Sequence, residues 1–141
     1  MRKQRLQVEF EFDFDVYGIV SALKDYKLAW NVNNDLHINL NKQKDITIQF
    51  VDSELVISHY KYSTDNSELQ LLRNKSYELL GGENQYLVPE MHQMDYFITL
   101  QGEINGWTNQ EIQNKLKSTV GIDFVMKMDI EKLESRENFI F

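Results

Sequence analysis

Residues 8–15 read VEFEFDFD, an unbroken alternation of apolar and acidic side chains. Successive side chains of a β-strand point to opposite faces of the sheet, so this alternation predicts a strand with one apolar and one acidic face. The apolar set extends from Leu6 to Val16, and we expect a strand over residues 6–16 that is interrupted at Gly18. The two faces would carry Phe10, Phe12 and Phe14 on one side and Glu9, Glu11, Asp13 and Asp15 on the other.

The acidic row of this strand has two interpretations. Alternate residues of a strand lie about 6.7 Å apart, too far for neighbouring carboxylates to share one calcium ion whose oxygen ligands lie about 2.3–2.6 Å away. We therefore interpret the row as a solvated face, with lysine or arginine on a neighbouring strand reducing the repulsion. Docking of a basic partner is the alternative.

The composition limits the class of protein. The chain has 141 residues, 42% of them hydrophobic, which fits one domain with one core. It has no cysteine, so disulfides, zinc-thiolate sites, iron–sulfur clusters and thiol nucleophiles are excluded. The N-terminal residues lack the apolar segment of a signal peptide, and no apolar run approaches the length of about 18 residues that spans a bilayer. We expect a cytoplasmic protein with no membrane contact.

The net charge of −7 weighs against nucleic acid as a ligand. Arg2, Lys3 and Arg5 gather at the N-terminus, which leaves the rest of the chain more acidic still. Nucleic-acid binding depends on neutralising phosphates with lysine and arginine. A binder of single-stranded RNA stays an alternative only if these three residues share one face with Lys61, Arg73 and Lys75, near the stacking side chains Tyr60 and Tyr62.

Two helices and several strands are predicted along the chain. Ser21 can cap a helix over residues 22–33, with Leu23, Tyr26, Lys27 and Trp30 on one face. Thr108 and Glu111 form a capping box that opens a second helix over residues 109–118. Strands are expected at residues 46–51 and 55–63, which would form a hairpin, at 94–101, and at 122–130 with Ile122, Phe124, Met126 and Met128 on one face.

One segment and the fold class complete the prediction. Residues 67–82 fit either a helix capped at Gly81 or a pair of strands folded around residues 73–76. The order of elements predicts a single α+β domain over residues 1–141, with a mainly antiparallel sheet and both helices packed on one face.

Residues 88–96 read VPEMHQMDY, which resembles the sequence signature of the bacterial IPExxxVDY family. Val88 and Met94 replace the isoleucine and the valine of that signature, and both keep an apolar side chain. Residues 13–33 and 130–141 are also similar to the family. The resemblance implies a small cytoplasmic protein and a strand at residues 69–74, and it implies no activity, cofactor or catalytic residue. Pro89, Glu90, Asp95 and Tyr96 match the motif one for one.

The motif itself allows a structural and a functional interpretation. In the first, residues 89–92 form a turn between two strands, Glu90 accepts main-chain N–H groups, Asp95 fixes the start of the next strand, and Tyr96 fills the core. In the second, Glu90 and Asp95 form a carboxylate pair with His92 for acid–base chemistry. A recognition loop is the third alternative.

Other catalytic and metal signatures are missing from the sequence. The three histidines, His37, His59 and His92, lie on different predicted elements and have no metal-binding spacing. No nucleophile elbow or phosphate-binding loop is present, and Ser58 and His59 would point to opposite sides of a strand. We expect no catalytic residue, no metal and no cofactor.

The chain ends in Phe139, Ile140 and Phe141, an unusually apolar terminus. These residues either fold back onto the domain or insert into a partner. The leading hypothesis is a non-enzymatic protein-binding module or adaptor that acts through the motif turn, the tail or both, and self-association is included. The candidate partner-binding residues are Glu90, His92, Phe139, Ile140 and Phe141.

Overall fold

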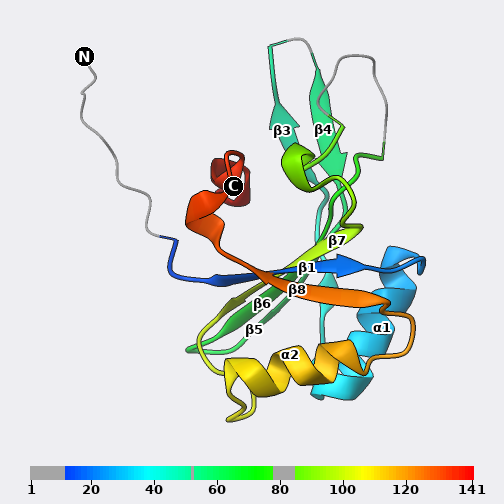
Figure 1. Ribbon diagram of the computed structural model, residues 1–141, viewed down its shortest axis with the longest axis vertical. Coiled ribbons are helices and arrows are strands. Elements are labelled where there is room, and N and C mark those ends of the chain that lie inside the picture. Colours follow the sequence, from blue (N-terminus) through cyan, green and yellow to red (C-terminus); the bar gives the residue numbers. More distant parts are fainter. Residues whose placement is uncertain (1–11, 52, 78–84) are drawn as a thin grey trace.

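The computed structural model describes residues 12–51, 53–77 and 85–141 (Figure 1). Residues 6–11 of the first predicted strand, the N-terminal Arg2, Lys3 and Arg5, and the predicted cap at Gly81 lie outside the described residues.

The described strands are all antiparallel and form two sheets. They are β1 (Asp15–Val20), β2 (Asn41–Lys42), β3 (Ile46–Gln49), β4 (Glu54–Ile57), β5 (His59–Ser63), β6 (Glu68–Arg73), β7 (Tyr96–Gln101) and β8 (Phe124–Met128). Six of them form one sheet in the order β2-β5-β6-β7-β1-β8, and β3 and β4 form a separate hairpin. With two helices, this is the predicted α+β fold.

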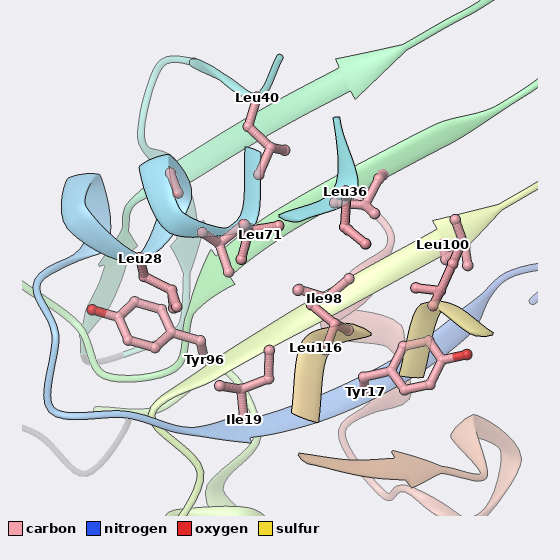
Figure 2. Close-up of a cluster of buried hydrophobic side chains, with 14 of the residues drawn as sticks. Tyr17, Ile19, Leu28, Leu36, Leu40, Leu71, Tyr96, Ile98, Leu100 and Leu116 are labelled. Carbon is pink, nitrogen blue, oxygen red and sulfur yellow. The ribbon is translucent and has the colours of Figure 1, made fainter. Parts of the chain in front are cut away.

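Both helices, α1 (Asp25–Leu36) and α2 (Asn109–Lys117), lie on one side of the large sheet (Figure 1). The predicted capping box of α2 is confirmed, because Thr108 Oγ1 accepts from the Glu111 N–H and Glu111 accepts from the Thr108 N–H. Figure 2 shows the core beneath the helices, with Ile98 of β7 and Leu116 of α2 near its centre.

The opposite face of the sheet is covered as well. The β3–β4 hairpin and the C-terminal segment lie on that side (Figure 1). A second apolar cluster there includes Val16, Leu72 and Phe97 from the sheet and Ile130 and Phe139 from the C-terminal segment. The tail therefore folds back onto the domain at Phe139, whereas Ile140 and Phe141 remain exposed. Burial on both faces gives the sheet two cores.

The position of β1 changes the interpretation of the acidic row. Tyr17 and Ile19 follow Asp13 and Asp15 at alternate positions and therefore belong to the same face of the strand. Both are fully buried beneath the helices. The prediction that Gly18 interrupts the strand is wrong, because Gly18 pairs with Phe97 on β7 and with Met126 on β8. A continuous apolar run over residues 16–20 is typical of a strand buried on both faces.

The two described carboxylates of the row have local partners. The Gln101 amide donates to Asp13 at 2.9 Å, and the Asn109 amide donates to Asp15. Lys127 of the neighbouring β8 lies 3.6 Å from Asp15, so the expected compensation by a cation is confirmed.

Helix α1 begins later than predicted and buries a different face. The Ser21 hydroxyl donates to the Gly121 carbonyl at 2.6 Å and accepts from the Leu23 N–H, so it does not cap the helix. Lys24 occupies the N-cap without a side-chain cap. The buried positions are Leu28, Ala29, Val32 and Leu36. Tyr26 and Trp30, placed on the apolar face by the prediction, are 63% and 59% exposed.

The strands decide two other predictions, for residues 55–63 and for residues 67–82. The predicted strand 55–63 divides into β4 and β5, which belong to different sheets, while the hairpin of β3 with β4 is confirmed. The helical alternative for residues 67–82 is wrong where the structure describes them, because residues 68–73 form β6 between β5 and β7. In the part of the chain that the structure describes, no helix is long and apolar enough to span a lipid bilayer.

Candidate functional site

Residues 88–96 form the turn that the structural interpretation predicts. A 3-10 turn, η1 (Pro89–Met91), precedes β7. Asn74, at the end of β6, is fully buried and bonds the turn at three points: its amide donates to the Met91 and Met94 carbonyls at 3.1 and 2.8 Å, and its side-chain oxygen accepts from the Val88 N–H at 2.9 Å. One side chain therefore satisfies main-chain groups on both sides of the turn.

Glu90 points from the turn to the C-terminal segment. Its carboxylate accepts from the Ser135 N–H at 2.9 Å and from the Ser135 hydroxyl at 2.8 Å. Partial burial pulls the pKa of Glu90 upward, but hydrogen bonds from Ser135 and from the main chain of Glu90 and Glu134 together outweigh it and hold the pKa below the usual 4.5. Glu90 thus accepts a main-chain N–H, as predicted, and ties the turn to the tail.

Asp95 and Tyr96 point the other way, toward the start of α1. The Ser21 N–H donates to Asp95 Oδ2 at 2.8 Å, and the Tyr96 hydroxyl donates to the Leu23 carbonyl at 2.6 Å. Tyr96 is buried in the helix-side core, and burial, with a smaller contribution from the charge of Asp25, raises its pKa to about 12. The predicted core role of Tyr96 is confirmed. The Asp95 side chain, however, bonds the segment that leads into α1 and not the start of β7, so its predicted role is corrected.

A cavity of 610 Å³ opens between these elements. One wall is the segment 21–25, a second is the end of β6 with residues 75–77, and the third is the 92–96 end of the motif. The side chains that define its chemistry are Lys24, Asp25, Arg73, Lys75, Tyr77, Tyr86, His92, Met94, Asp95 and Tyr96. The volume is in the range of small-molecule and side-chain binding pockets.

The strand order explains why a cation lies here. Leu69, Leu71 and Arg73 alternate onto the helix-covered face of β6, and Arg73 pairs across the sheet with Tyr96. Leu69 and Leu71 are buried in the core, whereas Arg73 lies past its edge and faces the cavity. Just beyond β6, Lys75 pairs with Tyr86 in a single antiparallel bridge, which brings a second cation and an aromatic ring to the same opening.

The cations and carboxylates of the cavity differ in their partners. Asp25 accepts from the Tyr77 hydroxyl at 2.9 Å, and Asp95 accepts from the Ser21 N–H. The ion pairs among the described residues are Lys42–Asp45, Lys61–Glu68 and Lys127–Asp15. Within the same described part of the chain, Lys24, Arg73 and Lys75 form none. The Arg73 guanidinium instead lies 5.0 Å from the centre of the Tyr77 ring.

The predicted acid–base trio does not come together. His92 and Asp95 line the cavity, but Glu90 lines a separate, smaller pocket with Ser135. The ring of His92 lies 6.1 Å from the ring of Tyr86, measured between ring centres. The catalytic alternative requires one concave site lined by all three side chains. Glu90 lies outside the cavity that His92 and Asp95 line.

The remaining candidate residues lie apart from the cavity. His37 ends α1 beside Trp107, and His59 is buried between Gln70 and the Phe141 ring. Across the described ranges, no three His, Asp or Glu side chains gather closely enough to hold a metal ion. Lys61 is paired with Glu68 on β6, so of the three described basic residues proposed for nucleic acid, Arg73 and Lys75 meet at the cavity and Lys61 lies elsewhere.

Sequence reasoning missed Lys24, Tyr77 and the buried role of Asn74. For Arg73 a signal existed, because it follows Leu69 and Leu71 in a period-2 register and therefore falls on their face of a strand. Lys24 and Tyr77 come from segments that meet only through tertiary contacts, and nothing in their local pattern indicates the cavity.

Comparisons with known proteins add no relative: no protein-family model matches the chain, and no curated protein does. The similarity of residues 88–96 to the IPExxxVDY signature therefore stays a prediction.

Proposed function

We propose that the chain is a non-enzymatic protein-binding module that holds an acidic segment of a partner in the cavity beside residues 88–96. The observation that carries this proposal is the presence of Lys24, Arg73 and Lys75 around one opening, without an ion pair among the described residues. A partner that supplies negative charge would compensate them, and complementary charge also favours rapid association.

The hydrogen bonds of the motif support binding over catalysis. Asp95 accepts a main-chain N–H, Tyr96 donates to a main-chain carbonyl, and Glu90 is bonded to Ser135 outside the cavity. A general base must be free to reach the proton that it abstracts.

Under this proposal the chain is one cytoplasmic, IPExxxVDY-like domain, and a second copy of the chain is included among its partners.

The test compares two double variants with equal charge change. Arg73→Glu with Lys75→Glu reverses two cations of the cavity, whereas Lys44→Glu with Lys132→Glu reverses two exposed lysines that do not line it. After cross-linking in native lysate and purification, the wild type and the control pair should retain a stoichiometric partner. The cavity pair should lose at least about nine-tenths of it, as expected when charge-assisted contacts are removed.

Two results would contradict the proposal. One is a protein that is monomeric in sedimentation experiments and recovers no stoichiometric partner. The other is equal recovery by the cavity pair and the wild type, which would place the partner on another surface, with the exposed Phe141 as the next position to test.

A further inference from the structure

The balance of charges around the cavity indicates what kind of anion fits it. Three cations, Lys24, Arg73 and Lys75, face two carboxylates, Asp25 and Asp95. The lysine, arginine and aspartate side chains of the described lining therefore carry one net positive charge. A single carboxylate on the ligand balances that charge, whereas a phosphoryl group with a charge of about −1.5 to −2 exceeds it.

Arg73 has the geometry to recognise a carboxylate. Its guanidinium lies over the face of the Tyr77 ring, and among the described residues it forms no ion pair. A guanidinium that stacks on a ring keeps its in-plane N–H groups available, and these match the two oxygens of a carboxylate. The Tyr77 hydroxyl is held by Asp25 at 2.9 Å, so the ring that supports Arg73 is itself anchored.

The cavity is larger than a carboxylate requires. Its 610 Å³ are enclosed partly by Met94 and by the rings of Tyr77, Tyr86 and Tyr96. These surfaces offer apolar contact to a neighbouring group of the ligand beside the charged side chains of the opening. An acidic side chain alone would leave much of this surface uncovered.

We propose that the cavity binds a partner segment in which a carboxylate lies next to an aromatic or other apolar side chain. Arg73 pairs with the carboxylate through two N–H groups, Lys24 and Lys75 add positive charge at the opening, and the tyrosines and Met94 contact the apolar group. This inference rests on the proposed function, since it names the chemistry of the partner at the same cavity.

The test uses 3-phenylpropionate as a minimal probe, because it joins one carboxylate to one aromatic ring. In ¹H–¹⁵N NMR titrations of the full chain, the probe should shift the amide signals of the lining residues in a saturable manner. The uncharged analogue 3-phenylpropanamide, which has nearly the same shape, should bind at least about ten-fold more weakly, as expected for loss of a charge-assisted hydrogen bond. Arg73→Gln should weaken the binding of 3-phenylpropionate by a similar factor, and Lys132→Gln should leave it unchanged.

Three outcomes would overturn the inference. Shifts that fall outside the cavity lining would place the probe elsewhere, and equal binding of the acid and the amide would remove the role of the carboxylate. Tighter binding of phenyl phosphate than of 3-phenylpropionate would assign the cavity to a phosphoryl group. If the probe fails but the cross-linked partner is still lost in the Arg73→Glu, Lys75→Glu pair, only this inference falls and the proposed function stands.

Discussion

The two ends of the 88–96 motif point to opposite sides of the sheet and are satisfied differently. On one side, Glu90 is bonded to Ser135, and the Asn138 amide donates to the Leu87 carbonyl at 2.8 Å. On the other, Arg73 and Lys75 face a cavity and form no ion pair among the described residues. We call the first region the tail contact and the second the cavity. We infer from this difference that the tail contact contributes to stability, and the proposed function places partner binding at the cavity.

This assignment makes the two regions separable by mutation. Changes in the tail contact should lower the free energy of unfolding and leave partner binding by the folded protein intact. Changes in the cavity should do the reverse, because exposed or half-buried cations without ion pairs contribute little to stability.

The largest effect is expected at the tail contact from Phe139→Ala. The Phe139 ring is buried and packs against Phe97 and Phe14, with ring centres 5.8 and 6.3 Å apart. Its loss should lower the free energy of unfolding by about 3–5 kcal/mol, the usual cost of removing a buried phenylalanine. Urea denaturation measures this, and Phe141→Ala at the exposed terminus is the control, with a much smaller expected cost. Equal costs for the two variants would contradict the buried role of Phe139.

Asn74 lies between the two regions, and its replacement should affect both. Asn74→Ala leaves the Val88 N–H and the Met91 and Met94 carbonyls without their side-chain partner. Unpaired buried groups cost about 1–3 kcal/mol each, so we expect a loss of at least about 2 kcal/mol in urea denaturation. A loss well below about 1 kcal/mol would show that the turn keeps its shape without Asn74.

The contribution of Glu90 should depend on pH. Since its pKa is lower in the folded protein than in the unfolded chain, its stabilising effect is present above about pH 4.5 and is lost as the pH falls through the folded value. Glu90→Gln should therefore be less stable than the wild type at pH 7, and the difference should shrink toward pH 3. Denaturation at both pH values measures this, with Glu137→Gln as an exposed control. A difference that is constant across the range would exclude the carboxylate as the cause.

The smallest effect on stability is expected in the cavity. Arg73→Gln removes a charge that has no ion pair among the described residues but does contact the Tyr77 ring, so the free energy of unfolding should fall by no more than about 1 kcal/mol. The same variant should lose most of the partner that the wild type recovers. A loss of stability of about 2 kcal/mol or more would show that Arg73 is a structural residue and would break the comparison.

Local patterns predicted the parts of the fold that depend on neighbours in sequence. The Thr108 capping box and the turn at Pro89 are both confirmed, because their residues interact within a few positions. The start of α1 was missed since the Ser21 hydroxyl bonds Gly121, a hundred residues away. Tyr17 and Ile19, which share a face of β1 with Asp15, are buried for a related reason: α2, which is distant in sequence, covers that face together with α1.

The candidate site was predictable only in part. The sequence indicated His92, Asp95 and Tyr96 as neighbours, and all three line the cavity. It gave no sign that Arg73 would pair with Tyr96 or that Lys24 would approach them, since these positions meet through strand order and through the bond from Tyr96 to Leu23. The chemistry of the cavity is thus a product of the topology.

Site-specific photo-cross-linking tests the central claim most directly. A benzophenone amino acid replaces Ala22, which is exposed and lines the cavity without contributing to its charge, or Phe141, which is 54% exposed at the terminus. We predict that illumination in native lysate yields one dominant adduct from position 22 and none from position 141, and that Arg73→Glu with Lys75→Glu abolishes the adduct. An adduct from position 141 alone, or one from position 22 that survives both substitutions, would contradict the proposed binding at the cavity.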